Sequence, residues 1–414
     1  MGGVRIPDEQ ATPGEAALGL LAFVTPLATD MYLPAFPHLT EELPSSASGI
    51  QLTLTAFLLG MGLGQLVIGP LSDRFGRRVP LLTGALVMVV ASALCALAPS
   101  LGVLVVLRFV QGFSGSAGVV IGRAVITDAA SGDRAAKLFG TLMTLTGLGP
   151  VVAPVVGGAL TESTGWRGVF WVLTGVSALA LLGAVVFVPE TLPAGKRHSG
   201  GPRATLRAMR GVLADRAYLG CTLSFGLAFA MLFSYIAGSA FLFQKVLGLS
   251  IGHASLAFAG AGVVGTFASL AGTRLVGRFS PGGLLRTGLW AMAVCAAALC
   301  AVSLAGVLTL PLTMALLCLV FIGMRLVTAN AGALAMARVP HASGSGSAVL
   351  GTLQCALSAV TAPLVGLGGE DTAVPMFLSM TLCAALSLLS LLLTRGAPPV
   401  GAPAPAPRRE TARA

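Results

Sequence analysis

The sequence predicts an all-α membrane protein with twelve transmembrane helices, and two observations lead to this prediction. Of the 414 residues, 55% are hydrophobic and only 10% are charged, and the mean hydropathy is +0.91. A soluble domain carries about 25% charged residues, so this chain has too little polar surface to face water. The apolar residues also form runs of about 20, the length of one helical crossing, without the alternation that is typical of β-barrel strands.

The predicted helices are the apolar runs between breaks that are charged or rich in proline and glycine. A polar, basic segment at 189–216 divides them into two sets of six. The expected spans are 16–37, 50–68, 79–98, 101–122, 136–160 and 169–188 in the first half, and 218–246, 254–272, 284–304, 308–331, 347–366 and 374–393 in the second.

Lysine and arginine fall almost entirely on one side of the predicted membrane. Arg108 and Arg325 lie within spans, and only Arg167 and Lys245 lie on the opposite side of the membrane. Because basic loops stay in the cytoplasm, both termini are expected to be cytoplasmic. The expected parts are a cytoplasmic N-terminus (1–15), an N-terminal half (16–188), a cytoplasmic central loop (189–216), a C-terminal half (217–394) and a disordered, proline-rich tail (395–414).

Weak similarity between the two halves indicates an internal duplication. Gly-Thr-Leu at 140–142 recurs at 351–353, and Arg-Phe-Val from Arg108 is echoed by Arg-Leu-Val from Arg325. Parallel repeats of this kind are known in transporters, with substrate bound between them. The two six-helix halves are therefore expected to be pseudo-symmetric.

A dense charged turn joins the second and third predicted spans. An ordinary cytoplasmic loop would explain its arginines but not its spaced glycines or its acid. The turn resembles the loop between spans two and three of major facilitator transporters, and we expect it to act as a cytoplasmic latch. Its matching residues are Gly69, Asp73, Arg74, Gly76, Arg77 and Arg78.

Ionisable residues inside spans are costly and usually functional, and this chain has three: Asp30, Arg108 and Arg325. Asp30 and Arg108 are predicted at a similar depth, so they are expected to pair or to share a cavity. One interpretation is a static ion pair between two helices. The other is a carboxylate that exchanges protons as the cavity alternates between the two sides of the membrane.

The fifth predicted span combines small residues and prolines: Gly149, Pro150, Pro154, Gly157 and Gly158. Small residues every four positions let another helix approach closely, and prolines bend the helix. Residues alone indicate only a kinked, tightly packed helix. The pattern also resembles the fifth-span signature of drug:proton antiporters, which major facilitator importers generally lack.

Two further segments sharpen this resemblance. Residues 29–37 (Thr-Asp-Met-Tyr-Leu-Pro-Ala-Phe-Pro) and 234–239 (Ser-Tyr-Ile-Ala-Gly-Ser) are similar to the bicyclomycin/chloramphenicol-resistance (Bcr/CflA) branch of the major facilitator superfamily. The resemblance implies the major facilitator fold, proton coupling through Arg108, and export of antibiotics or other drug-like molecules against entering protons. Arg325 departs from the pattern, because relatives usually have a small residue there, and 274–279 lacks an acid corresponding to Asp73.

Several residues are candidates for lining a substrate cavity. Phe225, Phe229 and Phe233 form a stripe on one helix face, which could instead contact lipid or a neighbouring helix. Arg325 could instead anchor two helices to each other. The excess of arginine over acid within the spans disfavours lipophilic cations as substrates. The candidates are Tyr32, Gln111, Phe225, Phe229, Phe233, Tyr235, Arg325, Asn330 and Gln354.

Other functions find little support in the sequence. No phosphate-binding loop is present, the seven cysteines lie singly in apolar runs, and no catalytic or metal-ligating set is evident. We therefore expect no enzyme, no cofactor, no metal and no nucleic-acid partner, but a monomer in the bacterial inner membrane driven by the proton gradient. A proton-coupled importer or metabolite exporter of the same fold remains the alternative, and a channel or receptor would not need Asp30.

Overall fold

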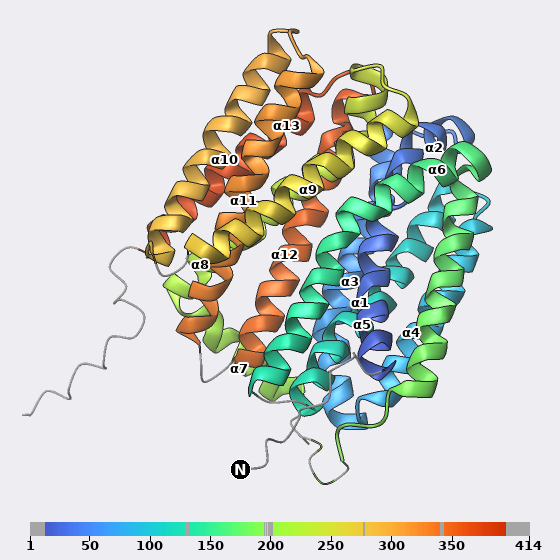
Figure 1. The fold of residues 1–414 in the computed structure, drawn as a ribbon, viewed down its shortest axis with the longest axis vertical. Coiled ribbons are helices and arrows are strands. Elements are labelled where there is room, and N and C mark those ends of the chain that lie inside the picture. The colour runs from blue at the N-terminus through green and yellow to red at the C-terminus, as the bar shows by residue number, and fades with distance from the viewer. Residues whose placement is uncertain are drawn as a thin grey trace, which may run out of the picture.

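The computed structural model describes residues 13–129, 132–193, 195, 197, 202–275, 278–339 and 343–394. The described residues form an elongated bundle whose helices run roughly along its length (Figure 1). The N-terminal half comprises α1 (Pro13–Asp30), a 3-10 turn (Leu33–Ala35), α2 (Phe36–Glu42), α3 (Ala47–Phe75), α4 (Arg78–Ala96), α5 (Leu101–Ala129) and α6 (Gly132–Phe187). The C-terminal half comprises α8 (Arg216–Phe241), a π-helical turn (Leu242–Val246), α9 (Ile251–Leu275), α10 (Pro281–Leu304), α11 (Leu310–Arg338), α12 (Ser343–Val365), a 3-10 turn (Gly366–Gly368), α13 (Val374–Ser390) and a last 3-10 turn (Leu391–Thr394).

Helix α6 contains two membrane crossings. It is 56 residues long, and a straight helix of that length would extend about 84 Å, far beyond the hydrocarbon core of about 30 Å. At Gly165 the backbone has φ 69° and ψ −179°, so the helix is interrupted there. Eleven of the described helices are long and apolar enough to cross a membrane. Counting the two parts of α6 separately confirms the twelve spans and the all-helical class that the sequence predicts.

The first predicted span is interrupted in its middle. Helix α1 ends at Asp30, and after Met31 and Tyr32 a 3-10 turn leads into α2. Pro34 within this turn and Pro37 at the start of α2 each remove a backbone donor, which favours the break. The acidic residue of the first span therefore lies at the end of a helix rather than within one.

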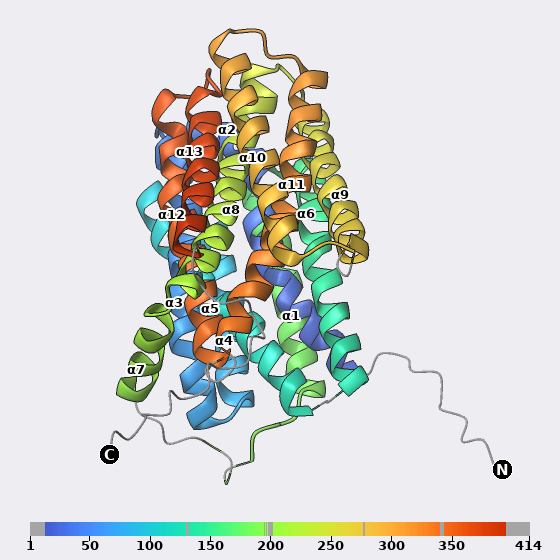
Figure 2. The ribbon, with the colours of Figure 1, turned by 90° about the vertical axis from the view of Figure 1, so that its left-hand side faces the viewer.

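The segment expected as a central loop contains one helix, α7 (Pro202–Leu213). Val212 on α7 packs against Tyr218 and Val339 of the C-terminal half. Arginines recur along α7 on one side of its apolar positions, the pattern of a helix at a boundary between polar and apolar surroundings. Figure 2 shows α7 at one end of the bundle.

The two ends of the bundle differ in charge. One end, which we call the basic end, carries the turn between α3 and α4 and the segment after α6. The other, the acidic end, is closed by contacts between the two halves. The charged residues of the basic end include Arg74, Arg77, Arg78, Arg123 and Arg197, and the acids of the opposite end are Glu41, Glu42, Glu162, Glu370 and Asp371.

The two halves meet along α3 with α12 and α6 with α9 (Figures 1 and 2). Their polar contacts gather toward the acidic end. The Lys245 ammonium lies 3.4 Å from the Glu41 carboxylate. The Glu162 carboxylate accepts a hydrogen bond from the Gly252 N–H at 3.0 Å. The Gln51 and Gln244 side chains donate across the interface to the carbonyls of Ala237 and Pro34 at 3.0 and 2.9 Å.

Close backbone contact between helices depends on glycine. Gly60 of α3 lies against the Phe109 carbonyl of α5, and Gly112 of α5 lies against the Phe57 carbonyl of α3. A Cβ at either glycine would overlap the facing carbonyl oxygen. In lipid, helix association depends on this kind of close packing rather than on the hydrophobic effect.

Gly112→Ala is expected to lower the stability of the folded protein by about 1–3 kcal/mol, because the new methyl group must push α3 away from α5. The matched control is Gly122→Ala on the same helix, where no atom lies within 4 Å of an added Cβ. That change should be neutral or stabilising by up to about 1 kcal/mol, since alanine favours helix. Melting temperatures in detergent test the pair, and equal melting temperatures would contradict the close contact.

Candidate functional site

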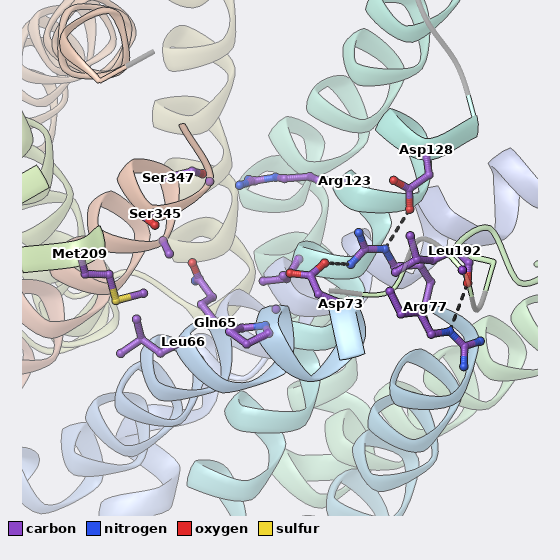
Figure 3. A pocket seen from close by; sticks show the side chains of 17 residues that line it. Gln65, Leu66, Asp73, Arg77, Arg123, Asp128, Leu192, Met209, Ser345 and Ser347 are labelled. Carbon is purple, nitrogen blue, oxygen red and sulfur yellow. Dashed lines mark hydrogen bonds and ion pairs between the residues drawn. The ribbon is translucent and has the colours of Figure 1, made fainter. Parts of the chain in front are cut away.

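A cavity of about 1070 Å³ separates the two halves at the basic end (Figure 3). Its walls come from α3 and α5 on one side and from α7 and the start of α12 on the other. Figure 3 shows the charged side chains gathered on the N-terminal half and the serines facing them from α12. The lining residues include Gln65, Gly69, Asp73, Arg77, Arg123, Asp128, Leu192, Arg197, Met209, Ser345 and Ser347.

Arg77 is the centre of a charged cluster at the mouth of this cavity. Its guanidinium donates to the carboxylates of Asp73 at 2.5 Å and Asp128 at 2.9 Å, and to the Ser72 hydroxyl at 2.8 Å. Burial alone would lower the pKa of Arg77, but the hydrogen bonds and charges of Asp128 and Asp73 outweigh it and raise the pKa. The cluster therefore fixes the start of α4 against the end of α5.

Glu190 caps the N-terminus of α4 from outside that helix. Its carboxylate accepts hydrogen bonds from the N–H groups of Arg77 at 2.8 Å and Arg78 at 3.2 Å. Partial burial raises the pKa of Glu190, but hydrogen bonds from the N–H groups of Leu192, Arg77 and Arg78 and the charge of Arg197 together lower it. A carboxylate is well placed there, since a helix N-terminus carries unpaired donors and partial positive charge.

Each predicted latch residue has a definite place around this cluster. Gly76 has φ 93° and lies against the Glu190 carboxylate, so both its backbone conformation and its surroundings exclude a side chain. Gly69 lines the cavity. Arg74 lies over the Phe75 ring at 5.3 Å, and Arg78 donates to the Val185 carbonyl at 2.8 Å.

Sequence reasoning missed Asp128 and Glu190, which complete the cluster. Both are acids at the edges of predicted spans, on a side of the protein that is otherwise strongly basic. Acids on the basic side of the protein are the feature of the sequence from which these partners of Arg77 could have been predicted. Arg123 was also missed as a lining residue, although Figure 3 shows it extending from α5 toward Ser347.

Asp30 and Arg108 do not form an ion pair, although the structure describes both. Asp30 is 3% exposed and lies near the middle of the first span, Ala16–Glu42. The Arg108 guanidinium instead donates to the Ala28 carbonyl at 2.9 Å and to the Gln111 side chain. Arg108 therefore holds the backbone of α1 two residues before the acid.

Aromatic rings surround the rest of the Arg108 guanidinium. Its central carbon lies 4.3 Å from the Tyr32 ring centroid, 4.4 Å from that of Phe57 and 5.8 Å from that of Phe170. Arg108 is completely buried, and its Nε and Nη2 atoms have no hydrogen-bond acceptor in the described part of the chain. Cation–π attraction, strongest away from water, stabilises the charge there instead of an acid.

The glycines and prolines of the fifth predicted span contact helices of both halves. Gly149 lies against Pro26 and Gly157 against the Met31 carbonyl, both on the first span. On the other face, Gly158 lies against Ser255 and the Pro150 carbonyl against Gly262, both on α9. Pro154 lines a small cavity beside Ser255 and Phe258. This part of α6 therefore lies between the segment that carries Asp30 and the C-terminal half.

The cavity candidates are divided among several positions. Tyr32 and Gln111 bind Arg108, and Gln111 also donates to the Ser92 hydroxyl at 2.8 Å. Tyr235 stacks on Phe258 with ring centroids 5.2 Å apart, and no described residue bonds to its hydroxyl. The remaining candidates lie on α8, α11 and α12: Phe225 and Phe229 in ring contact at 4.9 Å, Phe233 buried, Asn330 donating to the Leu326 carbonyl, and Arg325 and Gln354 half-buried.

Glu190→Ala is expected to lower stability by about 1 kcal/mol near neutral pH, the usual effect of removing a helix cap. Because folding lowers the pKa of Glu190 from its ordinary 4.5, its contribution is present above that value and disappears as the pH falls through the folded-state pKa. The melting temperatures of wild type and Glu190→Ala should therefore converge at low pH. Asp371→Ala, which removes an exposed acid at the other end, serves as the control, and a pH-independent difference would contradict the cap.

Comparison with known proteins agrees with this architecture. The profile of the Major Facilitator Superfamily matches residues 18–363. The chain is 38% identical over 382 residues to YdgK of Bacillus subtilis, an uncharacterized MFS-type transporter, covering 90% of this chain and 93% of that protein. It is 30% identical to a bicyclomycin resistance protein homologue of Haemophilus influenzae, covering 90% and 94% of the two chains. It is 28% identical to the multidrug resistance protein MdtL of Klebsiella pneumoniae, covering 90% and 93%.

Solved structures share the fold at low sequence identity. A bacterial homologue of the human lysosomal transporter Spinster, in an inward-facing and occupied conformation, superposes with a TM-score of 0.73 at 18% identity, covering 92% of this chain and 95% of that one. A D-xylose–proton symporter superposes with a TM-score of 0.71 at 17% identity, covering 93% and 97%. Since the family profile and the relatives both extend along most of the chain, the protein belongs to the major facilitator superfamily and is a multi-pass membrane transporter.

Proposed function

We propose that the protein is a proton-coupled antiporter of the bicyclomycin/chloramphenicol-resistance branch that exports antibiotics or other drug-like molecules from a bacterial cell. It works as a monomer in the inner membrane by alternating access. The observation that carries this proposal is the position of α6. Gly157 holds this helix against Met31, next to Asp30, while Gly158 and Pro150 hold it against α9 of the other half.

Asp30 is proposed as the proton carrier. It is the one acid near the middle of a described span, because the others lie at span ends. An ionised carboxylate buried in a low dielectric is costly, so protonation and burial favour each other. Asp30 would take up a proton when its side of the cavity is hydrated and lose it when the cavity opens to the opposite side. Arg108, bound to the Ala28 carbonyl, keeps α1 in register during this exchange.

The basic end is proposed to face the cytoplasm, with both termini on that side. It carries most of the arginines, whereas Arg167 and Lys245 stand among the acids of the other end. Short loops rich in lysine and arginine remain in the cytoplasm. With this orientation the cavity of about 1070 Å³ opens inward, as required for loading a substrate from the cell interior.

The latch is proposed to act between Asp73 and α12. Asp73 is half exposed at the cavity wall, and the first turn of α12, with Ser345 and Ser347, forms the wall opposite. The first N–H groups of a helix have no partner within it and favour a carboxylate. When the cavity closes, Asp73 would cap α12 while Arg77 and Asp128 keep the acid in position.

Relatives named for drug resistance support export rather than import. The bicyclomycin resistance homologue and MdtL align along nine-tenths of this chain. The kinked α6 with its paired glycines, which importers of the superfamily generally lack, points the same way. The alternative is a metabolite exporter or a proton-coupled importer of the same fold, which differs in substrate or in the direction of proton movement.

Asp30→Asn is expected to abolish drug-dependent proton movement in proteoliposomes while leaving drug binding in place, since the amide cannot carry a proton. Chloramphenicol and bicyclomycin are suitable first substrates, with a pH-sensitive dye reporting proton flux. Asp371→Asn is the matched control and should transport as wild type. Wild-type rates in Asp30→Asn at all pH values would exclude Asp30 as the carrier, and co-movement of drug and protons would indicate symport.

Asp73→Asn is expected to slow turnover by roughly fivefold to tenfold, because the closed state loses about 1–1.4 kcal/mol of helix-terminal stabilisation. The dissociation constant of the drug should change little, since Asp73 lies at the mouth of the cavity. Transport rates and equilibrium binding of the same drug give the two quantities. Equal loss in both, or in neither, would argue against a latch.

A further inference from the structure

We propose that Arg325 is the substrate's charge-recognition residue and that it binds an acidic group of an aromatic anion. This inference rests on the proposed export function and specifies the substrate class. Arg325 lies within α11, in the C-terminal half, at the position that corresponds to Arg108 in the internal repeat. The two arginines have opposite surroundings, and that contrast is the starting point.

Arg325 lies on the part of α11 that is close to both α8 and α9. Helix α11 packs against both of these helices. On one side of Arg325 along α11, Phe321 contacts the Tyr235 ring with centroids 5.1 Å apart. On the other side, Gly332 lies against the Phe225 ring. Because positions 321, 325 and 332 are spaced by four and seven residues, they share one face of the helix, so the arginine lies between two direct contacts with α8.

The same face of α11 is distinct from its outer surface. Leu312, Leu319 and Ile322 are exposed by 39–49% and form an apolar outer row. Arg325 belongs instead to a row of half-buried residues together with Cys318, Thr328 and Gly332. Arg325 is therefore less exposed than the apolar outer row of the same helix.

The Arg325 guanidinium has no protein partner among the described residues. Its Nε–H group is buried and donates to no acceptor among the described residues, and no ion pair joins the side chain to a described acid. Arg108, by contrast, donates to the Ala28 carbonyl and lies between aromatic rings. An unpaired guanidinium in a low-dielectric site is unfavourable unless an anion or a polar ligand joins it during the transport cycle.

A glycine on the neighbouring helix makes room for this guanidinium. A Cβ at Gly265 of α9 would lie 3.3 Å from Nε and 3.5 Å from Nη2 of Arg325. The absence of a side chain there lets the planar group lie against the α9 backbone with its other edge free. A free guanidinium edge is suited to a carboxylate, which it binds through two parallel hydrogen bonds.

Aromatic rings lie at a suitable distance for the rest of the substrate. Gly332 of α11 and Phe225 of α8 mark one level of the bundle. Arg325 lies seven residues from Gly332 along α11, about 10 Å from that level, and Phe229 lies four residues from Phe225 along the antiparallel α8, about 6 Å from it in the same direction. Phe225 and Phe229 are in ring contact at 4.9 Å and are half-buried. The pair offers an apolar surface roughly one helical turn from the guanidinium, which fits a planar aromatic acid.

The test compares an acid with its neutral ester. Purified full-length protein is titrated with nalidixic acid, a planar aromatic carboxylate, and with its methyl ester. Wild type should bind the acid about tenfold or more tightly than the ester, as a charge-assisted bidentate contact requires. Arg325→Gln should remove this preference and leave ester binding unchanged, and Arg325→Lys should retain part of it. Arg286→Gln, at the exposed start of α10, is the control and should bind as wild type.

A second measurement separates recognition from a structural role. If Arg325 is kept for ligand binding, Arg325→Met should raise the melting temperature of the ligand-free protein, because an unpaired buried charge is removed. A structural anchor would lower it. Gly265→Val should weaken acid binding with the charge intact, since the added methyls displace the guanidinium.

Three results would overturn the inference: equal affinity of wild type for acid and ester, equal weakening of both by Arg325→Gln, or a lower melting temperature of Arg325→Met. Failure of the proposed function is a different outcome. A protein that exports chloramphenicol against protons but shows no acid preference keeps the function and excludes this role of Arg325. A protein that prefers the acid through Arg325 but moves no protons keeps the role and excludes antiport.

Discussion

The contact between Gly157 and the Met31 carbonyl determines how the parts of this transporter are arranged. Helices in lipid gain nothing from hiding apolar surface, so they associate where their backbones can approach. Here the approach joins α6 to the first span next to Asp30, and the opposite face of α6 meets α9 through Gly158 and Pro150. One helix thus contacts both the residue next to Asp30 and the other half.

The charges inside the bundle are stabilised by different means. Arg108 is bound by a carbonyl, an amide and three aromatic rings, and no acid is required. Asp30 is buried and does not form an ion pair with Arg108. The Arg325 guanidinium has no hydrogen-bond acceptor and no acidic partner among the described residues. Buried polar groups without partners are expected at functional sites, and Arg325 has such a group in the C-terminal half.

The polar contacts between the halves are unevenly distributed. At the acidic end, Lys245, Gln244 and Glu162 cross the interface. At the basic end the halves are separated by the cavity, and the strong interactions around Arg77 stay within the N-terminal half. The two halves are thus joined at the acidic end and separated at the basic end. Alternating access requires that the halves can be joined at one end while they are apart at the other.

The sequence by itself determined the class, the number of spans and the family, because long apolar runs and the glycine–charge spacing of 69–78 depend only on local residues. It also identified Asp30, Arg108 and Arg325, since charge within an apolar run is conspicuous. Only the tertiary structure decided their partners. Arg108 meets Ala28, Tyr32 and Phe170 from distant parts of the chain, and Asp128 and Glu190 join Arg77 across 51 and 113 residues. Composition and periodicity carry no information on which helices become neighbours, because that choice depends on backbone approach at glycines and on the geometry of side chains in three dimensions.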